Sequence, residues 1–289
     1  MTGTRRDRSH LLTTRQMALF TARGFLRFDE LVPRELCERF VDAYPNADGI
    51  PLVAAGTPLD DAAVPGTPLH DFFALPAVRG IVESLVGPGC LLDHHFLHWR
   101  EPDGAPSQHM HQDSTIDPRT PFDVQLMFFP QQVTREMGGT YFLPGSHFRK
   151  VNEASITRYQ NIVGTQHVVC EPGTLLAMHM GIWHGGGCNR SAVRRVMYKV
   201  RLNPTVRQRR LWNDEDVDEK MNAPQPIFAP TWPHDPNDVQ TILCHPERWF
   251  EADTARLEYL NRIRLWRHLL GDPSFDAHYW MTRLENDPR

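Results

Sequence analysis

A chain of 289 residues with 40% apolar and 23% charged side chains is long enough for one large domain and has the composition of a globular protein. Its 31 basic and 35 acidic side chains leave a net charge of -4, which excludes the strongly basic footprint of a general nucleic-acid-binding protein. The sequence contains no run of 18 apolar residues, and the charged residues 1–10 contain no apolar stretch, so we expect neither a membrane span nor a secretory signal.

The first 90 residues are predicted to be mainly helical. Thr13 or Thr14 can cap the first helix, and Gly24 ends it. A segment rich in glycine, proline and alanine suggests a long surface loop before the last of these helices. The predicted elements are a helix at residues 15–23, a strand at 25–28, a helix that Pro33 opens, the loop at 45–68 and a helix at 76–85.

After Gly89 the pattern changes to short β-like runs that are separated by turn residues. These runs cover residues 91–99, 122–129, 140–143, 167–170, 174–179 and 196–202. Several short strands with no helices between them predict an antiparallel sandwich or barrel. Apolar residues at helical spacing over 253–270 predict a helical C-terminal tail. We therefore expect a single domain over residues 1–289, with a barrel core at about 90–204 and a C-terminal extension at about 205–289.

A candidate metal site begins at His111 and Asp113. On an extended strand these two side chains point to the same face, where they would supply two ligands of a facial triad. The best third ligand is His184, which lies in a glycine-rich segment after the run at 174–179. Two histidines and one carboxylate are typical of non-haem Fe(II) oxygenases rather than zinc hydrolases. An HxD triplet alone is weak support, because a surface histidine near a surface aspartate has the same pattern.

A basic pair, Arg194 and Arg195, follows the second histidine by 10 and 11 positions. In 2-oxoglutarate oxygenases such an arginine anchors the distal carboxylate of the cosubstrate through two parallel hydrogen bonds. In the strand that follows, the even positions are apolar and the odd positions include Lys199 and Arg201. A half-buried strand would turn Arg194 inward and Arg195 to solvent. Because a buried arginine needs a partner, Arg194 is favoured as the anchor, and Arg195 is the alternative.

Several motifs occur in an order that is typical of one family. They are His111-Gln112-Asp113, the turn segments at 137–140 and 144–147, the glycine-rich segment at 183–187, and Arg194-Arg195-Val196 at the start of the last strand. On these motifs the chain resembles the phytanoyl-CoA dioxygenase family of Fe(II)/2-oxoglutarate oxygenases, from about residue 12 to residue 204. In relatives the first residue of the basic pair binds 2-oxoglutarate, which agrees with the alternation in the strand.

The resemblance implies a mainly β fold with flanking helices, a double-stranded β-helix (jelly-roll, cupin-like barrel). It implies Fe(II) bound by His111, Asp113 and His184, with 2-oxoglutarate as cosubstrate and O2 as oxidant. The cosubstrate would be decarboxylated to succinate and CO2 while a C–H bond of the substrate is hydroxylated. Halogenation is not expected, because related halogenases replace the carboxylate at position 113 by a small residue.

The resemblance also suggests cosubstrate contacts for Arg100, Met127 and Phe129. Without it, Arg100 would be a surface arginine at a strand end, and the other two would be plain core residues. One departure concerns Gly186, which stands where relatives often have a small hydroxyl residue that contacts the cosubstrate. One polar contact is therefore missing here or comes from another part of the chain.

The remaining functional expectations concern alternatives and partners. The chain could instead be a metal-binding cupin-like barrel without oxygenase activity, a scaffold, or an oxygenase of this class that catalyses desaturation or cyclisation. We expect a small-molecule substrate that the sequence does not identify, no nucleic acid and no membrane partner, and a monomer or homodimer. Five widely spaced cysteines without a CxxC pair favour a reduced, cytoplasmic setting over a disulfide framework or a structural zinc site.

Overall fold

The structure is a computed structural model, which describes residues 8–46, 48–102, 104, 106–113, 122–148, 162–208 and 210–215. No helix in these ranges is long and apolar enough to cross a membrane. The helical tail predicted at residues 253–270 lies outside the described residues and stays a prediction. The division into a barrel core and a C-terminal extension also stays a prediction.

The α-helices of the described residues all lie in the N-terminal part of the chain. They are α1 (Thr14–Arg23), α2 (Arg34–Ala43), α3 (Pro68–Ala74) and α4 (Pro76–Leu85). At the start of α1, the Thr13 side chain accepts from the backbone of Gln16, and the Gln16 side chain accepts from the backbone of Thr13. The helix α3 was not predicted, although Thr67 caps it and Pro68 occupies its first turn.

The strands form two antiparallel sheets, as the spacing of the β-like runs predicts. The six-stranded sheet has the order β1 (Phe25–Phe28), β7 (Thr174–His179), β4 (Val124–Phe129), β9 (Arg195–Asn203), β3 (Leu91–Arg100), β2 (Thr57–Pro58). The three-stranded sheet has the order β6 (Gln166–His167), β5 (Thr140–Leu143), β8 (Trp183–Gly186). The predicted mainly β, jelly-roll fold with N-terminal helices is confirmed. The strand β8 was not among the predicted runs, and β6 is shorter than predicted.

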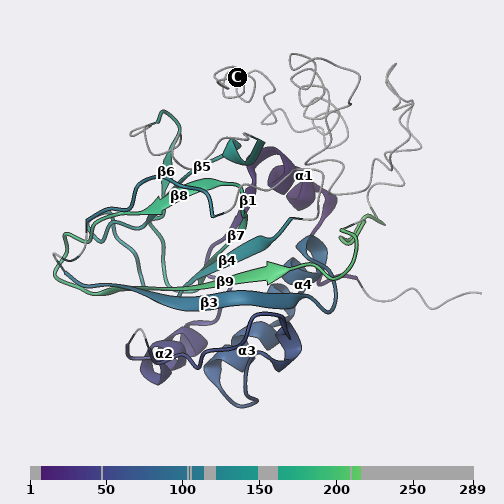
Figure 1. The fold of residues 1–289 in the computed structure, drawn as a ribbon, viewed down its shortest axis with the longest axis horizontal. Helices are drawn as coiled ribbons and strands as arrows, with labels where there is room; N and C mark the ends of the chain where they lie inside the picture. Colours follow the sequence, from purple (N-terminus) through teal and green to yellow (C-terminus); the bar gives the residue numbers. More distant parts are fainter. Residues whose placement is uncertain are drawn as a thin grey trace, which may run out of the picture.

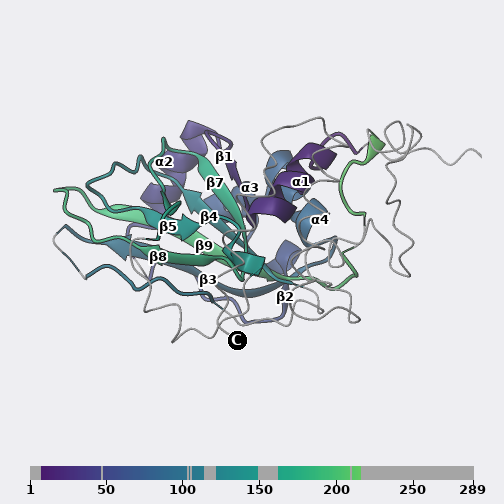
Figure 2. The ribbon, with the colours of Figure 1, turned by 90° about the horizontal axis from the view of Figure 1, so that it is seen from above.

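One face of the six-stranded sheet is covered by helices. Figure 1 shows α2 and α3 on one side of this sheet and the three-stranded sheet on the other. On the helical side, the ring of Phe128 in β4 lies 5.2 Å from Phe40 of α2 and 4.8 Å from Phe72 of α3. Tyr198 of β9 lies 5.5 Å from the ring of Phe40. Seen from above, α1 and α4 lie together at one end, away from the three-stranded sheet (Figure 2).

The opposite face of the six-stranded sheet lines the interior of the jelly roll. Met127 and Phe129 of β4 form a separate apolar cluster there, which includes Phe142 of β5 in the smaller sheet. Because directly paired residues of an antiparallel sheet share a face, the pairing of Met127 with Lys199 places Lys199 on this inner face. The inner face of this sheet therefore combines apolar side chains from β4 with basic side chains from β9.

Candidate metal and cosubstrate site

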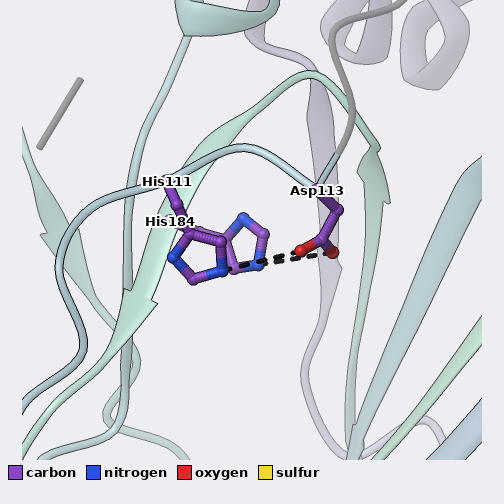
Figure 3. A group of neighbouring side chains, drawn as sticks. All are labelled: His111, Asp113 and His184. Carbon is purple, nitrogen blue, oxygen red and sulfur yellow. Dashed lines mark ion pairs between the residues drawn. The ribbon is translucent and has the colours of Figure 1, made fainter. Parts of the chain in front are cut away.

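The three predicted metal ligands converge inside the jelly roll. One potential ligand atom from each of His111, Asp113 and His184 can be chosen so that all lie within 4.8 Å of one another. The Nε2 atom of His111 lies 3.5 Å from Oδ1 of Asp113, and that of His184 lies 3.7 Å from Oδ2. Figure 3 shows both imidazole rings and the carboxylate directed toward one another. Side chains 71 positions apart in the sequence thus meet at one point.

Backbone pairing fixes the two histidines relative to each other. The amide of His111 donates to the carbonyl of His184 at 2.9 Å, and the amide of His184 donates back to the carbonyl of His111 at 2.7 Å. Each ring then lies near a carbonyl oxygen two residues earlier, His109 for His111 at 2.8 Å and Ile182 for His184 at 3.0 Å. The two histidine ligands therefore lie on paired backbone, His184 in β8 and His111 in the segment beside it.

These ring contacts also decide which nitrogen can bind a metal ion. A carbonyl oxygen only accepts, so Nδ1 carries a proton in both rings, and Nε2, the nitrogen that lies near Asp113, is the atom that can bind a metal ion. Burial lowers the pKa of His184 to about 4, which keeps this ring neutral at physiological pH. The hydrogen bond with Asp113 raises the pKa of His111, so a metal ion that binds its Nε2 would displace a proton from this ring. Two imidazoles and a carboxylate are a donor set that fits a divalent transition metal.

Asp113 is held as an anion by its neighbours. Burial alone would raise its pKa, but the contact with the His111 ring and the charge and hydrogen bond of Lys199 hold the pKa of this carboxyl well below its usual range. The ammonium group of Lys199 donates to Oδ2 of Asp113 at 2.7 Å, and the side-chain amide of Gln125 donates to the same oxygen. The carboxylate is therefore both charged and oriented without a metal ion.

The two arginines of the basic pair lie in different places from those predicted. Arg194 precedes β9, its side chain is 47% exposed, and its Nε lies 2.6 Å from Oε1 of Glu101. Its guanidinium also lies 4.8 Å from the ring centre of Trp99. Arg195 is only 5% exposed and donates to the carbonyl of Met137 at 3.0 Å. The prediction that Arg194 turns inward and Arg195 faces solvent is therefore wrong.

The reason lies in what covers each face of β9. The alternation of its side chains is as predicted, and the even positions are buried. The apolar face with Tyr198, however, packs against α2 and α3 rather than against the site. The face that carries Arg195 and Lys199 is buried too, because it forms one wall of the interior.

Two guanidinium groups meet beside β8. Arg100 of β3 pairs in register with Arg195, and one terminal nitrogen of each lies 3.7 Å from the position that a Cβ atom of Gly186 would take. Burial, together with the charge of Arg100, lowers the pKa of Arg195 to about 10. Within the described ranges, no carboxylate pairs with either group, whereas Lys199 pairs with Asp113. Two adjacent cations without a counter-ion favour a bound anion.

The other predicted cosubstrate residues lie on the same wall. Met127 and Phe129 are buried on the inner face of β4, next to Met197 of β9 in the same apolar cluster. Gln125 was not among the predicted site residues, although it is a polar residue within the predicted β-like run at 122–129. Lys199 was expected to face solvent together with Arg195, and its place on the inner face corrects that expectation.

Comparisons with known proteins agree with this architecture. The model of the family described as phytanoyl-CoA dioxygenase (PhyH) matches residues 22–197. Among solved structures, HygX from Streptomyces hygroscopicus with nickel and 2-oxoglutarate bound has 17% identity and a TM-score of 0.53, and the match covers 67% of this chain and 87% of that one. AviO1 from Streptomyces viridochromogenes Tue57 has 14% identity and a TM-score of 0.52, with 71% and 98% covered.

A third solved structure extends the range of relatives. The non-heme alpha ketoglutarate dependent carbocyclase SnoK from nogalamycin biosynthesis has 17% identity and a TM-score of 0.50, and the match covers 70% of this chain and 87% of that one. A search of curated proteins finds no match. The family model covers more than half of the sequence, and so the chain belongs to the phytanoyl-CoA dioxygenase family of Fe(II)/2-oxoglutarate-dependent oxygenases.

Proposed function

We propose that this protein hydroxylates an unactivated C–H bond of a small-molecule substrate and releases succinate and CO2 from 2-oxoglutarate. The observation that supports this proposal most directly is that the metal-ligand triad and a buried arginine lie close together in the interior of the jelly roll. A triad of two histidines and one carboxylate lies near a buried guanidinium, Arg195, that has no carboxylate partner in the described chain. Such a triad leaves coordination positions open for a cosubstrate and O2.

The metal ligands would be Nε2 of His111, Nε2 of His184 and the carboxylate of Asp113. An iron ion bound there supplies the activation of O2, which no side chain can perform. The protein contributes the orientation of the ligands: each imidazole is fixed through Nδ1, and Asp113 is fixed by Lys199 and Gln125.

Arg195, rather than Arg194, would bind the distal carboxylate of 2-oxoglutarate. Arg195 is desolvated and faces the interior, so that a carboxylate would supply the counter-charge that the described residues do not. Arg194 already pairs with Glu101 outside the interior. Arg100 lies close enough to Arg195 to share the anion, and Met127 and Phe129 would form the apolar side of the cosubstrate site.

The substrate class is proposed from two neighbours of the same fold. One solved structure of HygX contains hygromycin B, and SnoK is described as a carbocyclase from nogalamycin biosynthesis. We therefore propose a small organic substrate, with cyclisation as the second candidate reaction because of SnoK. A cytoplasmic location belongs to the same proposal, since the four described cysteines are free.

Anaerobic titration with Fe(II) and 2-oxoglutarate tests the function. A visible charge-transfer band is expected when the keto acid chelates the iron, and succinate should form once O2 and a substrate are added. Asp113→Ala removes the anionic ligand and should abolish the band and the coupled turnover. A wild-type protein that binds Fe(II) but develops no band with 2-oxoglutarate would instead be a metal-binding barrel without oxygenase activity.

A further inference from the structure

Gln108 is attached to β8 in an unusual way. Its backbone amide donates to the carbonyl of Gly186 at 2.9 Å, as in a regular strand pair. The amide of Gly186, however, donates at 2.9 Å to Oε1 of the Gln108 side chain. The backbone carbonyl of Gln108 accepts instead from the hydroxyl of Tyr141. The side-chain amide of Gln108 is thus fixed two residues beyond the metal ligand His184.

The missing side chain at position 186 makes room for this contact. A Cβ atom on Gly186 would lie 2.9 Å from Oε1 of Gln108, which is too close for an ordinary contact. The same point lies 3.7 Å from a terminal nitrogen of Arg100 and 3.7 Å from one of Arg195. The side-chain amide and the two guanidinium groups therefore surround one small space. All three carry N–H donors, as a site for a carboxylate requires.

We propose that Gln108 is a third anion-binding group of this site, and that its Nε2 donates to the carboxylate of 2-oxoglutarate held by Arg195 and Arg100. The proposal rests on the function proposed above. Because Oε1 already accepts from Gly186, the amide orientation is set, and both hydrogens on Nε2 remain to be donated. Within the described residues, no hydrogen bond from Nε2 is formed. The polar contact that a side chain at position 186 would supply thus comes from Gln108.

Two substitutions at position 108 separate binding from a structural role. Gln108→Leu removes the donor and the acceptor, and the dissociation constant of 2-oxoglutarate should rise about tenfold. Gln108→Glu keeps an oxygen that can accept from Gly186 but replaces the donor by a negatively charged oxygen. Gln108→Glu should weaken the binding of 2-oxoglutarate at least as much as Gln108→Leu does, because the new charge repels the carboxylate.

A substitution at position 186 provides an independent test. Gly186→Ala deletes no polar group, and the backbone at this glycine is not left-handed, so the backbone conformation tolerates alanine. The new methyl group would displace the Gln108 amide, and 2-oxoglutarate affinity should fall as it does in Gln108→Leu. Adding Gln108→Leu to Gly186→Ala should cause little additional loss, since both changes remove the same contact.

The measurement is the anaerobic charge-transfer titration with 2-oxoglutarate, together with the Ni(II) affinity of each variant without cosubstrate. Ni(II) affinity should stay at the wild-type value, because Gln108 does not contact the triad. Wild-type 2-oxoglutarate affinity in Gln108→Glu would overturn the proposal, even if Gln108→Leu is impaired, since it would show that only the bond to Gly186 matters. A wild-type protein without a charge-transfer band would overturn the proposed function and this inference together.

Discussion

Lys199 and Asp113 are joined by a 2.7 Å hydrogen bond between the ammonium group and Oδ2, across 86 positions of sequence. Both side chains are largely buried, with exposed fractions of 11% and 15%. The lysine therefore supplies a positive charge next to the carboxylate before any metal ion binds. A divalent metal ion at the triad would be a second cationic partner of the same carboxylate.

Substitution of Lys199 should destabilise the metal-free protein more than the Ni(II)-bound protein. In Lys199→Met the buried carboxylate of Asp113 loses its cation, and the free energy of unfolding should fall by about 3 kcal/mol. Ni(II) bound at the triad would replace the lost charge, so the deficit should be smaller in saturating Ni(II). Denaturant unfolding with and without Ni(II) measures both values.

Arg201 offers a matched control on the same face of β9. Its guanidinium pairs with Asp123 at 2.7 Å, and both side chains are as buried as the first pair. Because Asp123 is not part of the triad, the loss in Arg201→Met should be the same with and without Ni(II). Equal deficits in Lys199→Met under the two conditions would show that Lys199 does not compensate the ligand charge.

The adjacent arginines of β9 give a paired test of cosubstrate binding. Arg195→Met should raise the dissociation constant of 2-oxoglutarate by about 100-fold, the effect of removing one partner of a buried charge pair. Arg194→Met removes a half-exposed side chain that pairs with Glu101, and it should leave this constant within about twofold of the wild type. Anaerobic titration measures both. A larger effect from Arg194→Met would restore Arg194 as the anchor.

The error about this pair shows what periodicity can and cannot predict. The alternation along β9 correctly separates the two sets of side chains. It does not say which face borders the site, because that depends on α2 and α3, which come from a distant part of the chain. An apolar face was assumed to line the interior, whereas here it packs against helices, and the charged face lines the interior.

The ligands of the triad could be predicted from the sequence because each lies in a short local motif. Both features can be recognised without the fold: the spacing in His111-Gln112-Asp113 and the glycines that follow His184. The supporting contacts are not local: Gln108 reaches Gly186 across 78 positions, and Gln125 reaches Asp113 through pairing that only the folded chain creates. Such contacts leave at most one weak signal, a polar residue within an apolar run.

A pair of buried histidines predicts how stability depends on pH. The rings of His147 and His179 lie 5.2 Å apart. Burial lowers the pKa of His147 to about 4, and burial together with His147 lowers the pKa of His179 well below 6.5. Between about pH 6.5 and pH 4 the unfolded chain therefore binds protons that the folded protein excludes. The free energy of unfolding is therefore highest above about pH 6.5. It should fall by about 1.4 kcal/mol per pH unit for each histidine as the pH decreases below that value.

Denaturant unfolding from about pH 7 to about pH 5 measures this dependence. His179→Phe keeps a ring of similar shape that cannot be protonated, so the slope should decrease by the contribution of one histidine. An unchanged slope in His179→Phe would mean that this histidine is not excluded from protonation in the folded protein.

Gly80 inside α4 should reverse the usual effect of replacing a helical glycine. Gly→Ala in a helix normally stabilises a protein by up to about 1 kcal/mol. Here the new Cβ atom would lie 1.7 Å from the carbonyl oxygen of His10, because the N-terminal segment crosses the helix at this point and Leu12 donates to the hydroxyl of Ser84. Gly80→Ala should therefore lower the free energy of unfolding by about 2 kcal/mol, as overpacking does.

Deleting residues 1–11 removes that carbonyl, and in the shortened chain the same substitution should be neutral or stabilising. Thermal and denaturant unfolding of the four proteins measures the difference, and an equal loss in both backgrounds would place the clash elsewhere.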